Sequence, residues 1–188
     1  MRLMKQFYTI DIAGVKRDLQ LFPINEKLYI AAFILFGDVE ITRHAAAELL
    51  KRAPEHDIMI TAECKSIPLI YEMARQANAD DYVIARKAAK LYMEDVISVG
   101  VDSITTAASQ TLCIGKKEKE LLCGKRVLIV DDVISTGESL AALEALVEKA
   151  GGNIVGKMAV LAEGDAKDRD DILFLAPLPL FDADGNAI

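Results

Sequence analysis

The pattern of apolar and polar residues alternates between strand-like and helix-like segments, which predicts an α/β fold. Helices are expected over residues 42–53 and 138–150, where apolar side chains recur at intervals of three and four. Ser66 is placed to cap a further helix, with Pro68 in its first turn. Short apolar segments between these helices are expected to form strands over residues 6–12, 28–36, 57–61, 82–85, 126–130 and 154–161.

The best-defined unit is a strand, a helix and a second strand between residues 126 and 161. The Gly151-Gly152 pair ends the helix, because glycine adopts the left-handed cap conformation freely. The three elements form a βαβ crossover, which is right-handed in nearly all parallel sheets. Ligands bind such sheets beyond the carboxyl ends of the strands, where a turn is predicted over residues 131–137.

Composition narrows the possible functions. The chain has 188 residues, of which 52% are hydrophobic, so it can bury the core of one domain. The net charge of −7 argues against a nucleic-acid partner, which needs a basic surface. Three widely spaced cysteines and two isolated histidines indicate neither a disulfide framework, nor a zinc site, nor Ser-His-Asp catalysis. Because no targeting segment or bilayer-length apolar run is visible, we expect a cytoplasmic protein without a membrane partner.

The segment around the predicted turn carries the candidate chemistry. Two adjacent carboxylates, Asp131 and Asp132, end the strand, and the next helix begins directly after a short turn. Backbone N–H groups of the turn point into a concavity at the positive end of the helix dipole, which predicts a phosphate cradle. Hydroxyls of Ser135, Thr136 and Ser139 add hydrogen-bond donors. The paired carboxylates can bind diol hydroxyls, or Mg²⁺ directly or through water.

Other phosphate-binding and metal-binding classes fit this segment less well. The strand and acid pair also resemble the Mg²⁺ site of receiver domains, but in those domains the strand opens the chain. A phospho-acceptor Asp and a Lys then follow on later strands, and too little sequence follows residue 127 here. The glycine patterns of P-loop and dinucleotide binding are both absent.

Residues 127–139 resemble the motif with which type I phosphoribosyltransferases bind 5-phosphoribosyl 1-pyrophosphate (PRPP). The likeness covers roughly residues 55–165, nearest to the adenine and xanthine branch. Ala62-Glu-Cys-Lys-Ser66 resembles the pyrophosphate loop of that branch, in which the family has an unusual cis peptide bond, and Arg86-Lys87 resembles its basic pair. Lys65 and Ser66 stand where adenine enzymes have Arg and Gly. The compact ammonium group of lysine thus replaces the planar guanidinium of arginine, and serine is less free than glycine to take strained backbone angles.

The resemblance implies the type I phosphoribosyltransferase fold: a twisted, mainly parallel sheet flanked by helices, with a small hood. We expect a single domain over residues 1–188, with its core at about residues 41–175 and a hood from about residues 1–40, to which the C-terminal tail can add. The implied reaction joins adenine to PRPP and gives AMP and pyrophosphate. It inverts the anomeric carbon through an oxocarbenium-like transition state. Mg²⁺ is expected as the cofactor, and a homodimer is usual for the family.

The resemblance also assigns roles to individual residues. Asp131, Asp132 and Asp102 are the catalytic candidates, with the acid pair as Mg²⁺ ligands and Asp102 near the base. Residues 88–110 are expected to form a loop or ribbon that closes over PRPP. The other assignments are PRPP binding by Val133, Ile134, Ser135, Thr136, Gly137, Glu138 and Ser139; pyrophosphate binding by Glu63, Cys64, Lys65, Ser66, Arg86, Lys87 and Lys90; and base binding by Phe22, Asn25, Ile134 and Glu163.

The identity of the base and the occurrence of catalysis leave alternatives open. Xanthine-type enzymes read the base with a hood Asn and with a Lys that follows the Glu after the βαβ unit. Asn25 can supply the first or merely stabilise a turn, whereas Gly164 stands in place of the Lys, which favours adenine. A xanthine or hypoxanthine phosphoribosyltransferase is the alternative enzyme. A non-catalytic PRPP-sensing regulator is the alternative class, although no extra DNA-binding segment is visible.

Overall fold

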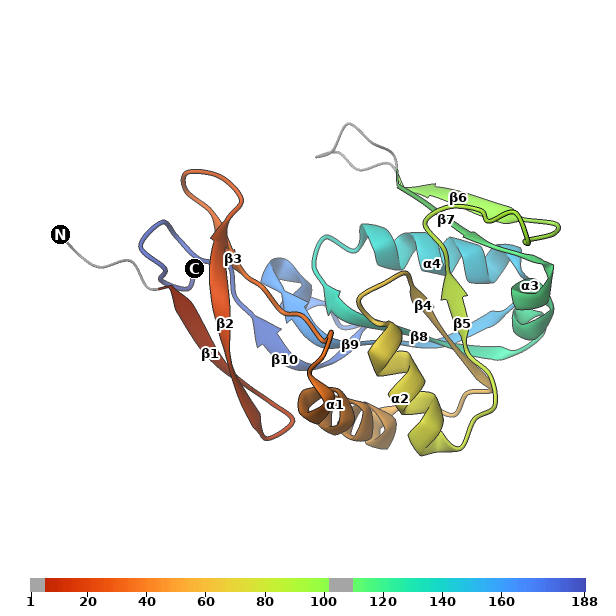
Figure 1. The fold of residues 1–188 in the computed structure, drawn as a ribbon, viewed down its shortest axis with the longest axis horizontal. Helices are drawn as coiled ribbons and strands as arrows, with labels where there is room; N and C mark the ends of the chain where they lie inside the picture. Colours follow the sequence, from red (N-terminus) through yellow and green to blue (C-terminus); the bar gives the residue numbers. More distant parts are fainter. Residues whose placement is uncertain (1–5, 102–109) are drawn as a thin grey trace.

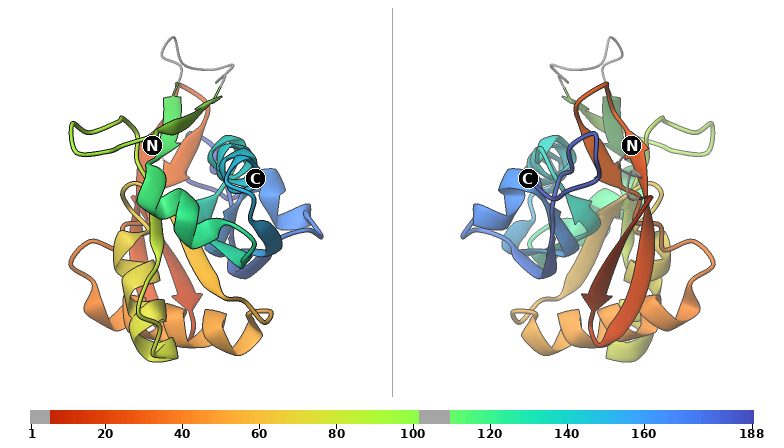
Figure 2. Two further views of the ribbon diagram at one scale, coloured as in Figure 1. Left: turned by 90° about the vertical axis from the view of Figure 1, so that its right-hand side faces the viewer. Right: turned by 90° about the vertical axis from the view of Figure 1, so that its left-hand side faces the viewer.

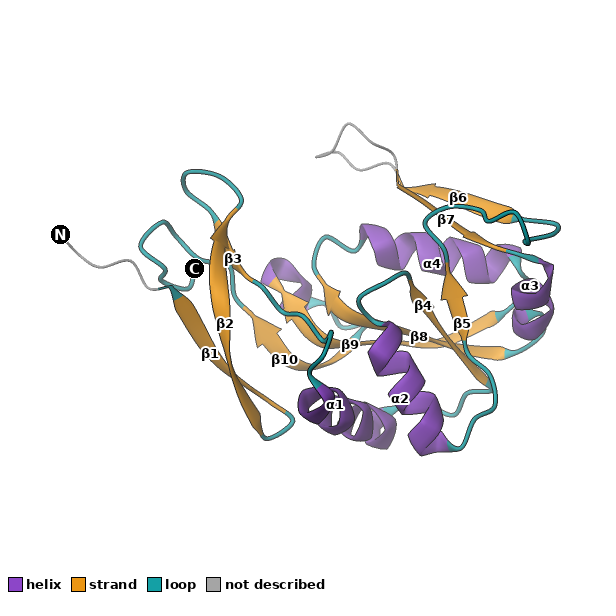
Figure 3. Cartoon of the chain, viewed as in Figure 1, coloured by secondary structure: helices purple, strands orange, loops and turns teal. Residues whose placement is uncertain are grey.

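The computed structural model describes residues 6–101 and 110–188, and a five-stranded parallel sheet forms its centre (Figures 1 and 3). The strand order is β10-β9-β8-β4-β5, and every neighbouring pair is parallel. The strands are β4 (Ile58–Ala62), β5 (Val83–Ala85), β8 (Arg126–Ile134), β9 (Asn153–Glu163) and β10 (Leu173–Leu178). The predicted fold class, a mainly parallel sheet between helices, is confirmed.

Helices cover both faces of the sheet (Figures 1 and 2). α1 (Val39–Arg52) and α2 (Ile67–Ala77) pack on one face, and α3 (Lys116–Leu122) and α4 (Glu138–Lys149) pack on the other. Alternate residues of β8 enter the two cores: Leu128 and Val130 pack with α1 and α2, whereas Val127 and Ile129 pack with α4. The unbroken apolar run of this strand is therefore explained by burial on both faces.

A small antiparallel sheet forms the hood at one end of the molecule. It consists of β1 (Phe7–Ile12), β2 (Val15–Pro23) and β3 (Tyr29–Ala31). The C-terminal tail returns to this sheet, because Tyr29 and Phe181 exchange backbone hydrogen bonds of 2.9 and 3.0 Å. The Phe181 ring is 1% exposed and lies 5.0 Å from the Tyr8 ring, centroid to centroid. The hood is thus built from both ends of the chain.

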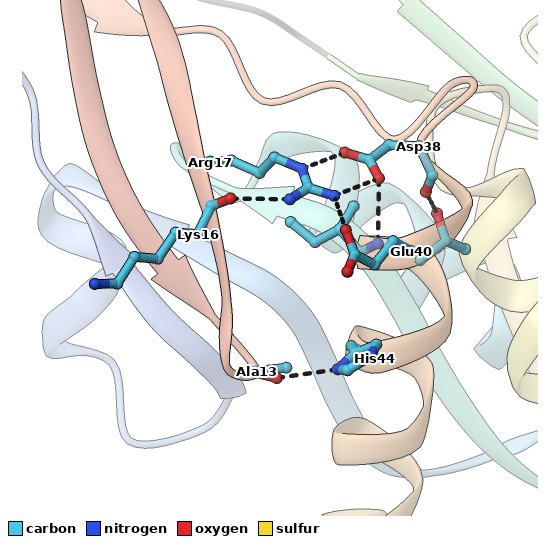
Figure 4. A network of polar contacts seen from close by, with 8 residues as sticks. Ala13, Lys16, Arg17, Asp38, Glu40 and His44 are labelled. Atoms are coloured by element: carbon cyan, nitrogen blue, oxygen red, sulfur yellow. Dashed lines mark hydrogen bonds and ion pairs between the residues drawn. The ribbon is translucent and has the colours of Figure 1, made fainter.

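An ion-pair network fixes the hood to the core (Figure 4). Arg17 of β2 donates hydrogen bonds of 2.6 and 2.9 Å to Asp38 and one of 2.8 Å to Glu40, at the start of α1. Asp38 also caps α1 by accepting from the Ile41 N–H at 3.2 Å. The hydrogen bonds from Arg17 lower the pKa of the Asp38 carboxyl. One carboxylate therefore joins the hairpin to the helix that follows it.

A two-stranded antiparallel ribbon, β6 (Ile97–Val101) and β7 (Gln110–Ile114), lies on the α4 side of the sheet (Figure 1). The Lys149 ammonium of α4 donates to the Ser98 carbonyl at 3.1 Å. The ribbon is the form expected for part of residues 88–110. The connection between its strands contains Asp102 and lies outside the described residues, so the role assigned to Asp102 stays a prediction.

Several element boundaries differ from the prediction. The turn predicted over residues 131–137 is shorter, because β8 continues to Ile134 by pairing with Ala162 of β9. The strand predicted over residues 28–36 is confined to β3, whose pairing with β2 ends at Ala31. Strand β2 is missing from the prediction. Among the described residues, no helix is both long and apolar enough to cross a bilayer.

Candidate functional site

An acid pair lies near the carboxyl end of β8, inside the strand rather than after it. Asp131 and Asp132 are 8% and 6% exposed. The Asp132 N–H donates to the Asp131 carboxylate at 2.9 Å, which draws the two side chains to one end of the sheet. Burial, and then the neighbouring charge of Asp132, raise the pKa of Asp131 above its ordinary value. The pair therefore favours ligands that donate protons or carry positive charge.

The predicted pyrophosphate loop connects β4 to α2 and approaches this acid pair. Its Glu63–Cys64 peptide bond is cis, as the resemblance implied. Ser66 donates to Asp131 at 2.5 Å and lies 3.0 Å from Asp132. Ser66 occupies the N-cap position of α2 as predicted, but its side chain makes no capping hydrogen bond. The expected helix cap is therefore corrected: the hydroxyl binds the acid pair instead.

Glu63 braces the loop against the segment after β5. Its carboxylate accepts from the Lys87 N–H at 3.1 Å and from the Arg86 guanidinium at 3.3 Å. These contacts, led by the Lys87 N–H, lower the pKa of Glu63. Glu63 also donates its own N–H to the Ala85 carbonyl at 2.8 Å. In this structure Glu63 thus orients the loop and partly neutralises Arg86.

Loop and acid pair line one cavity of about 210 Å³. Its lining residues come from three segments that the sequence predicted to be functional and, in addition, from Leu112 of β7. They are Ala62, Glu63, Cys64, Lys65, Ser66, Lys87, Leu112, Asp131, Asp132, Val133 and Ser139. The cavity brings together most of the residues assigned to pyrophosphate. Arg86 contacts the loop from outside the cavity lining, and Lys90 is exposed and also absent from that lining.

A smaller cavity of about 40 Å³ adjoins the first at the start of α4. It is lined by Asp131 and by every residue from Val133 to Leu140. Gly137 occupies the N-cap position of α4 without a side-chain cap, so backbone N–H groups of the first turn keep their hydrogen-bonding capacity. This is the arrangement predicted for a phosphate cradle.

Two features favour glycine at position 137. Its φ of 83° lies in the left-handed region, and a Cβ there would stand 2.7 Å from Nη1 of Arg169. Arg169 donates through Nε and Nη2 to Asp171, at 2.8 and 2.7 Å. Lys157 also pairs with Asp171. Sequence reasoning missed Arg169, because it lies 32 residues from Gly137 and belongs to no recognisable motif.

Three of the four residues assigned to the base lie apart from both cavities. Phe22 is 45% exposed in the hood. Asn25 accepts through its side chain from the N–H groups of Lys27 and Leu28, both at 2.9 Å, so it stabilises the turn between β2 and β3. Glu163 is half-buried near the charge of Lys65, and burial raises its pKa. In the described part of the chain, none of these three lines either cavity.

Ile134 is 2% exposed and packs in the core with α4. It also contributes to the lining of the smaller cavity. Val133 of the same strand is half-buried and lines both cavities. Val133 and Ile134 differ because successive side chains of a β-strand point to opposite faces of the sheet. The sequence predicted a turn at these residues, so this alternation was not expected there.

The acid pair also has the chemistry of an Mg²⁺ site. Carboxylate oxygens suit this cation, and Oδ2 of Asp132 is buried without a hydrogen-bond partner among the described residues. No group of three or more His, Cys, Asp or Glu side chains over residues 6–101 and 110–188 forms a metal cage. Mg²⁺ commonly binds through one or two carboxylates together with substrate phosphates, so Asp131 and Asp132 fit that mode.

Known proteins resemble this chain in sequence and in fold. A sequence model described as the phosphoribosyl transferase domain matches residues 39–176, more than half of the chain. A hypoxanthine/guanine phosphoribosyltransferase of Methanococcus voltae is 32% identical over 131 residues, which cover 69% of this chain and 66% of the relative. An adenine phosphoribosyltransferase of Thermosipho africanus is 30% identical over 171 residues, which cover 87% and 94%.

Two further matches concern regulation and fold. The purine biosynthesis transcriptional repressor PurR of Bacillus subtilis is 30% identical over 114 residues, which cover 61% of this chain and 39% of the repressor. A crystal structure of adenine phosphoribosyltransferase from Thermoanaerobacter pseudethanolicus superimposes with a TM-score of 0.65 at 22% identity. That superposition covers 92% of this chain and 95% of the other, and it supports the fold alone.

Proposed function

We propose that this chain, which belongs to the phosphoribosyltransferase domain family, is a purine phosphoribosyltransferase that joins adenine to PRPP and releases pyrophosphate. One observation carries the proposal: the uncapped start of a helix, an acid pair, and a loop that presents Lys65 beside Lys87 meet at the carboxyl edge of the sheet. PRPP presents a 5-phosphate, a ribose diol and a pyrophosphate in that order. The three subsites have matching chemistry.

Each subsite has a separate task. The N–H groups and hydroxyls of residues 135–139 hold the 5-phosphate at the start of α4. Asp131 and Asp132 accept hydrogen bonds from the ribose hydroxyls and orient the anomeric carbon. Lys65, Lys87 and the backbone of the loop receive the pyrophosphate. Mg²⁺, when bound with PRPP, supplies positive charge that the acid pair and the leaving group share.

Catalysis in this scheme depends on charge and position. The bond to pyrophosphate breaks as positive charge develops on the ribose, so the fixed carboxylates of Asp131 and Asp132 stabilise the transition state. Lys65 and Lys87 stabilise the negative charge that develops on pyrophosphate. Asp102 is proposed to handle a proton near the base, and Lys90 and Arg86 to add charge around the leaving group.

Adenine is proposed as the base because of the residue that follows Glu163. Gly164 has no side chain with which to donate a hydrogen bond to a second carbonyl oxygen of xanthine. A polar group buried without a partner costs about 1–3 kcal/mol, so a two-oxo base should bind poorly. Phe22 offers an apolar surface for stacking, and Asn25 keeps its amide N–H₂ for a base after its oxygen has served the turn.

Competition between free bases with PRPP in excess tests this assignment. Turnover is read from the ultraviolet change that accompanies nucleotide formation, and we expect the highest kcat/KM for adenine. A higher kcat/KM for hypoxanthine, guanine or xanthine would overturn the base but leave the transferase intact. The relative from Methanococcus voltae makes hypoxanthine and guanine the bases to compare first.

A PRPP-binding regulator is the second candidate, and the match to the PurR repressor favours it. The two classes differ in a single measurement. A regulator binds PRPP but releases no pyrophosphate with any purine base, whereas an enzyme does. PRPP binding without turnover in this assay would therefore replace the enzyme by the regulator.

A homodimer is proposed as the assembled state. Four exposed apolar side chains, Ile34, Phe36, Val39 and Tyr71, are each more than half exposed, and a groove of about 210 Å³ lies between α1 and α2. Exposed apolar groups gathered in this way are typical of interaction surfaces. Sedimentation equilibrium should give a dimer that Tyr71→Glu dissociates, whereas Leu91→Glu, at a fully exposed position elsewhere, should leave it intact.

A further inference from the structure

The hydroxyl of Ser66 makes an unusual set of contacts. It belongs to the pyrophosphate loop, yet it donates to Asp131 at 2.5 Å and lies 3.0 Å from Oδ1 of Asp132. It also accepts from the Asp132 N–H at 2.9 Å. With 1% of the residue exposed, water does not compete for these bonds. A buried hydroxyl therefore joins two parts of the site that are 65 residues apart in the chain.

The helix that Ser66 begins gains nothing from this hydroxyl. A serine at the N-cap ordinarily accepts from an N–H group of the first turn, and this one does not. The side chain thus forgoes a local stabilising contact and serves the acid pair instead. A residue that only shaped the loop or helix would not need this orientation.

Orientation of the Asp132 carboxylate depends on Ser66. In the part of the chain that the structure describes, Ser66 is the one side chain that hydrogen-bonds Oδ1 of Asp132, and Oδ2 is buried without any partner. The Asp131 carboxylate is held by Ser66 and by the Asp132 N–H. Removing the hydroxyl would take away the Ser66 bond from both carboxylates, would leave Asp131 with the Asp132 N–H, and would break this link between the loop and β8.

We propose that Ser66 is a positioning residue that couples the ribose subsite to the pyrophosphate subsite through its hydroxyl. The inference rests on the proposed function, which assigns the acid pair to ribose and the loop to pyrophosphate. A ligand that orders the carboxylates strengthens their bonds to Ser66, and this fixes the loop in the conformation that receives pyrophosphate. Binding at either subsite then favours binding at the other, by the same factor in both directions.

The residue found in adenine enzymes at this position makes the inference specific to this chain. Glycine, which the resemblance places there, has no hydroxyl and cannot form the link. Ser66→Gly is therefore an informative variant, and Ser66→Ala removes the hydroxyl without the backbone freedom of glycine. Ser66→Thr keeps the hydroxyl and adds one methyl group.

Calorimetry with two fragments of the substrate measures the coupling directly. Mg-pyrophosphate is titrated into the full chain with and without saturating ribose 5-phosphate, and the ratio of the two dissociation constants is the coupling factor. Repulsion between the two anions affects every variant alike, so comparison between variants isolates the hydroxyl. Thr61→Val is the matched control. It removes a different buried hydroxyl, which belongs to β4 and has no hydrogen-bond partner among the described residues.

We expect the coupling factor to fall about tenfold in Ser66→Ala and Ser66→Gly, which is the effect of losing one hydrogen bond to a charged group. Thr61→Val should keep the wild-type factor, and Ser66→Thr should recover most of it. In the complete reaction, Ser66→Ala should raise the KM for PRPP and leave the KM for the base unchanged. A purely structural role for Ser66 would not separate these quantities.

The possible failures are distinguishable. If the wild-type protein binds neither fragment, the proposed function is wrong, and so is this inference. If both fragments bind and the coupling factor is the same in wild type, Ser66→Ala and Ser66→Gly, the function stands and the role of Ser66 is wrong. Should Ser66→Ala not fold, Ser66→Gly alone decides, because it carries the residue that adenine enzymes have there.

Discussion

Replacing Gly137 by alanine should weaken phosphate binding and destabilise the fold through two separable effects. The φ of 83° places residue 137 in the left-handed region, which costs an L-amino acid about 1–2 kcal/mol. The new Cβ would also stand 2.7 Å from Nη1 of Arg169, so the guanidinium must move. Its ion pair with Asp171 is one-third exposed or more on both sides and is worth up to about 1 kcal/mol. The expected loss is therefore roughly 1–3 kcal/mol.

Gly14→Ala provides a matched control for the backbone effect. Gly14 has a φ of 80° in the turn between β1 and β2, and a Cβ there would meet no atom within 4 Å. Its substitution should cost only the conformational part, about 1–2 kcal/mol. Adding Arg169→Ala to Gly137→Ala should remove the collision but leave the backbone strain. Arg169→Ala should therefore lower the free energy of unfolding less in the Gly137→Ala protein than it does in wild type.

Urea denaturation and calorimetry test the two effects. Denaturation gives the free energy of unfolding of each variant, and titration with ribose 5-phosphate gives the affinity of the cradle. We expect Gly137→Ala to weaken ribose 5-phosphate binding about tenfold or more, because N–H groups of a shifted turn no longer point at one anion. Gly14→Ala should bind normally. Equal unfolding free energies for the two variants, with normal phosphate affinity in both, would refute the assignment of the cradle.

Three other substitutions have clear expected outcomes. Asp131→Asn combined with Asp132→Asn should abolish turnover while circular dichroism shows a folded protein, because two buried like charges are removed without loss of volume; measurable turnover would contradict the ribose assignment. Thr61→Val should raise the unfolding free energy by about 1 kcal/mol, since its hydroxyl is buried without a partner among the described residues; a lower unfolding free energy would reveal a missed contact. Hydrogen bonds from Arg75 lower the pKa of Glu72 to about 2 from 4.5, so Glu72 stabilises the fold above the unfolded pKa and loses that effect as pH falls towards 2. Glu72→Gln should therefore be less stable than wild type at neutral pH and equally stable near pH 2, and a pH-independent difference in urea denaturation would contradict this.

The elements with strong local patterns were predictable from the sequence. β8, α4 and β9 have an unbroken apolar run, a helical period and a closing glycine pair, and all three form where expected. The end of β8 was not predictable, because its last residues are held by pairing with β9, a contact between distant segments. β2 was missed because its alternation of polar and apolar residues is read clearly only when β1 is known to lie beside it.

The candidate site also has features that were predictable from the sequence and features that were not. Adjacent acids at the end of a strand, followed by a hydroxyl-rich turn and a helix, predict a phosphate site from local geometry alone. The meeting of that turn with the loop after β4 follows from the rule that parallel strands end at one edge of the sheet. The contacts of Ser66 with the acid pair and of Arg169 with Gly137 follow from no such rule, because side-chain direction at these positions is decided by packing.

The charge of the molecule explains why the acid pair is compatible with a polyanionic substrate. The chain carries a net charge of −7, and the larger cavity is lined by three carboxylates, those of Glu63, Asp131 and Asp132, against two ammonium groups. Arg86 and a backbone N–H already offset Glu63, so the uncompensated negative charge resides on the acid pair. A phosphorylated ligand that arrived without a cation would be repelled by this pair, whereas one that arrives with Mg²⁺ brings the charge that the pair lacks. In the proposed function, the pair therefore selects for the metal-bound form of the substrate, and the cradle at α4, which needs no cation of its own, holds the distant phosphate.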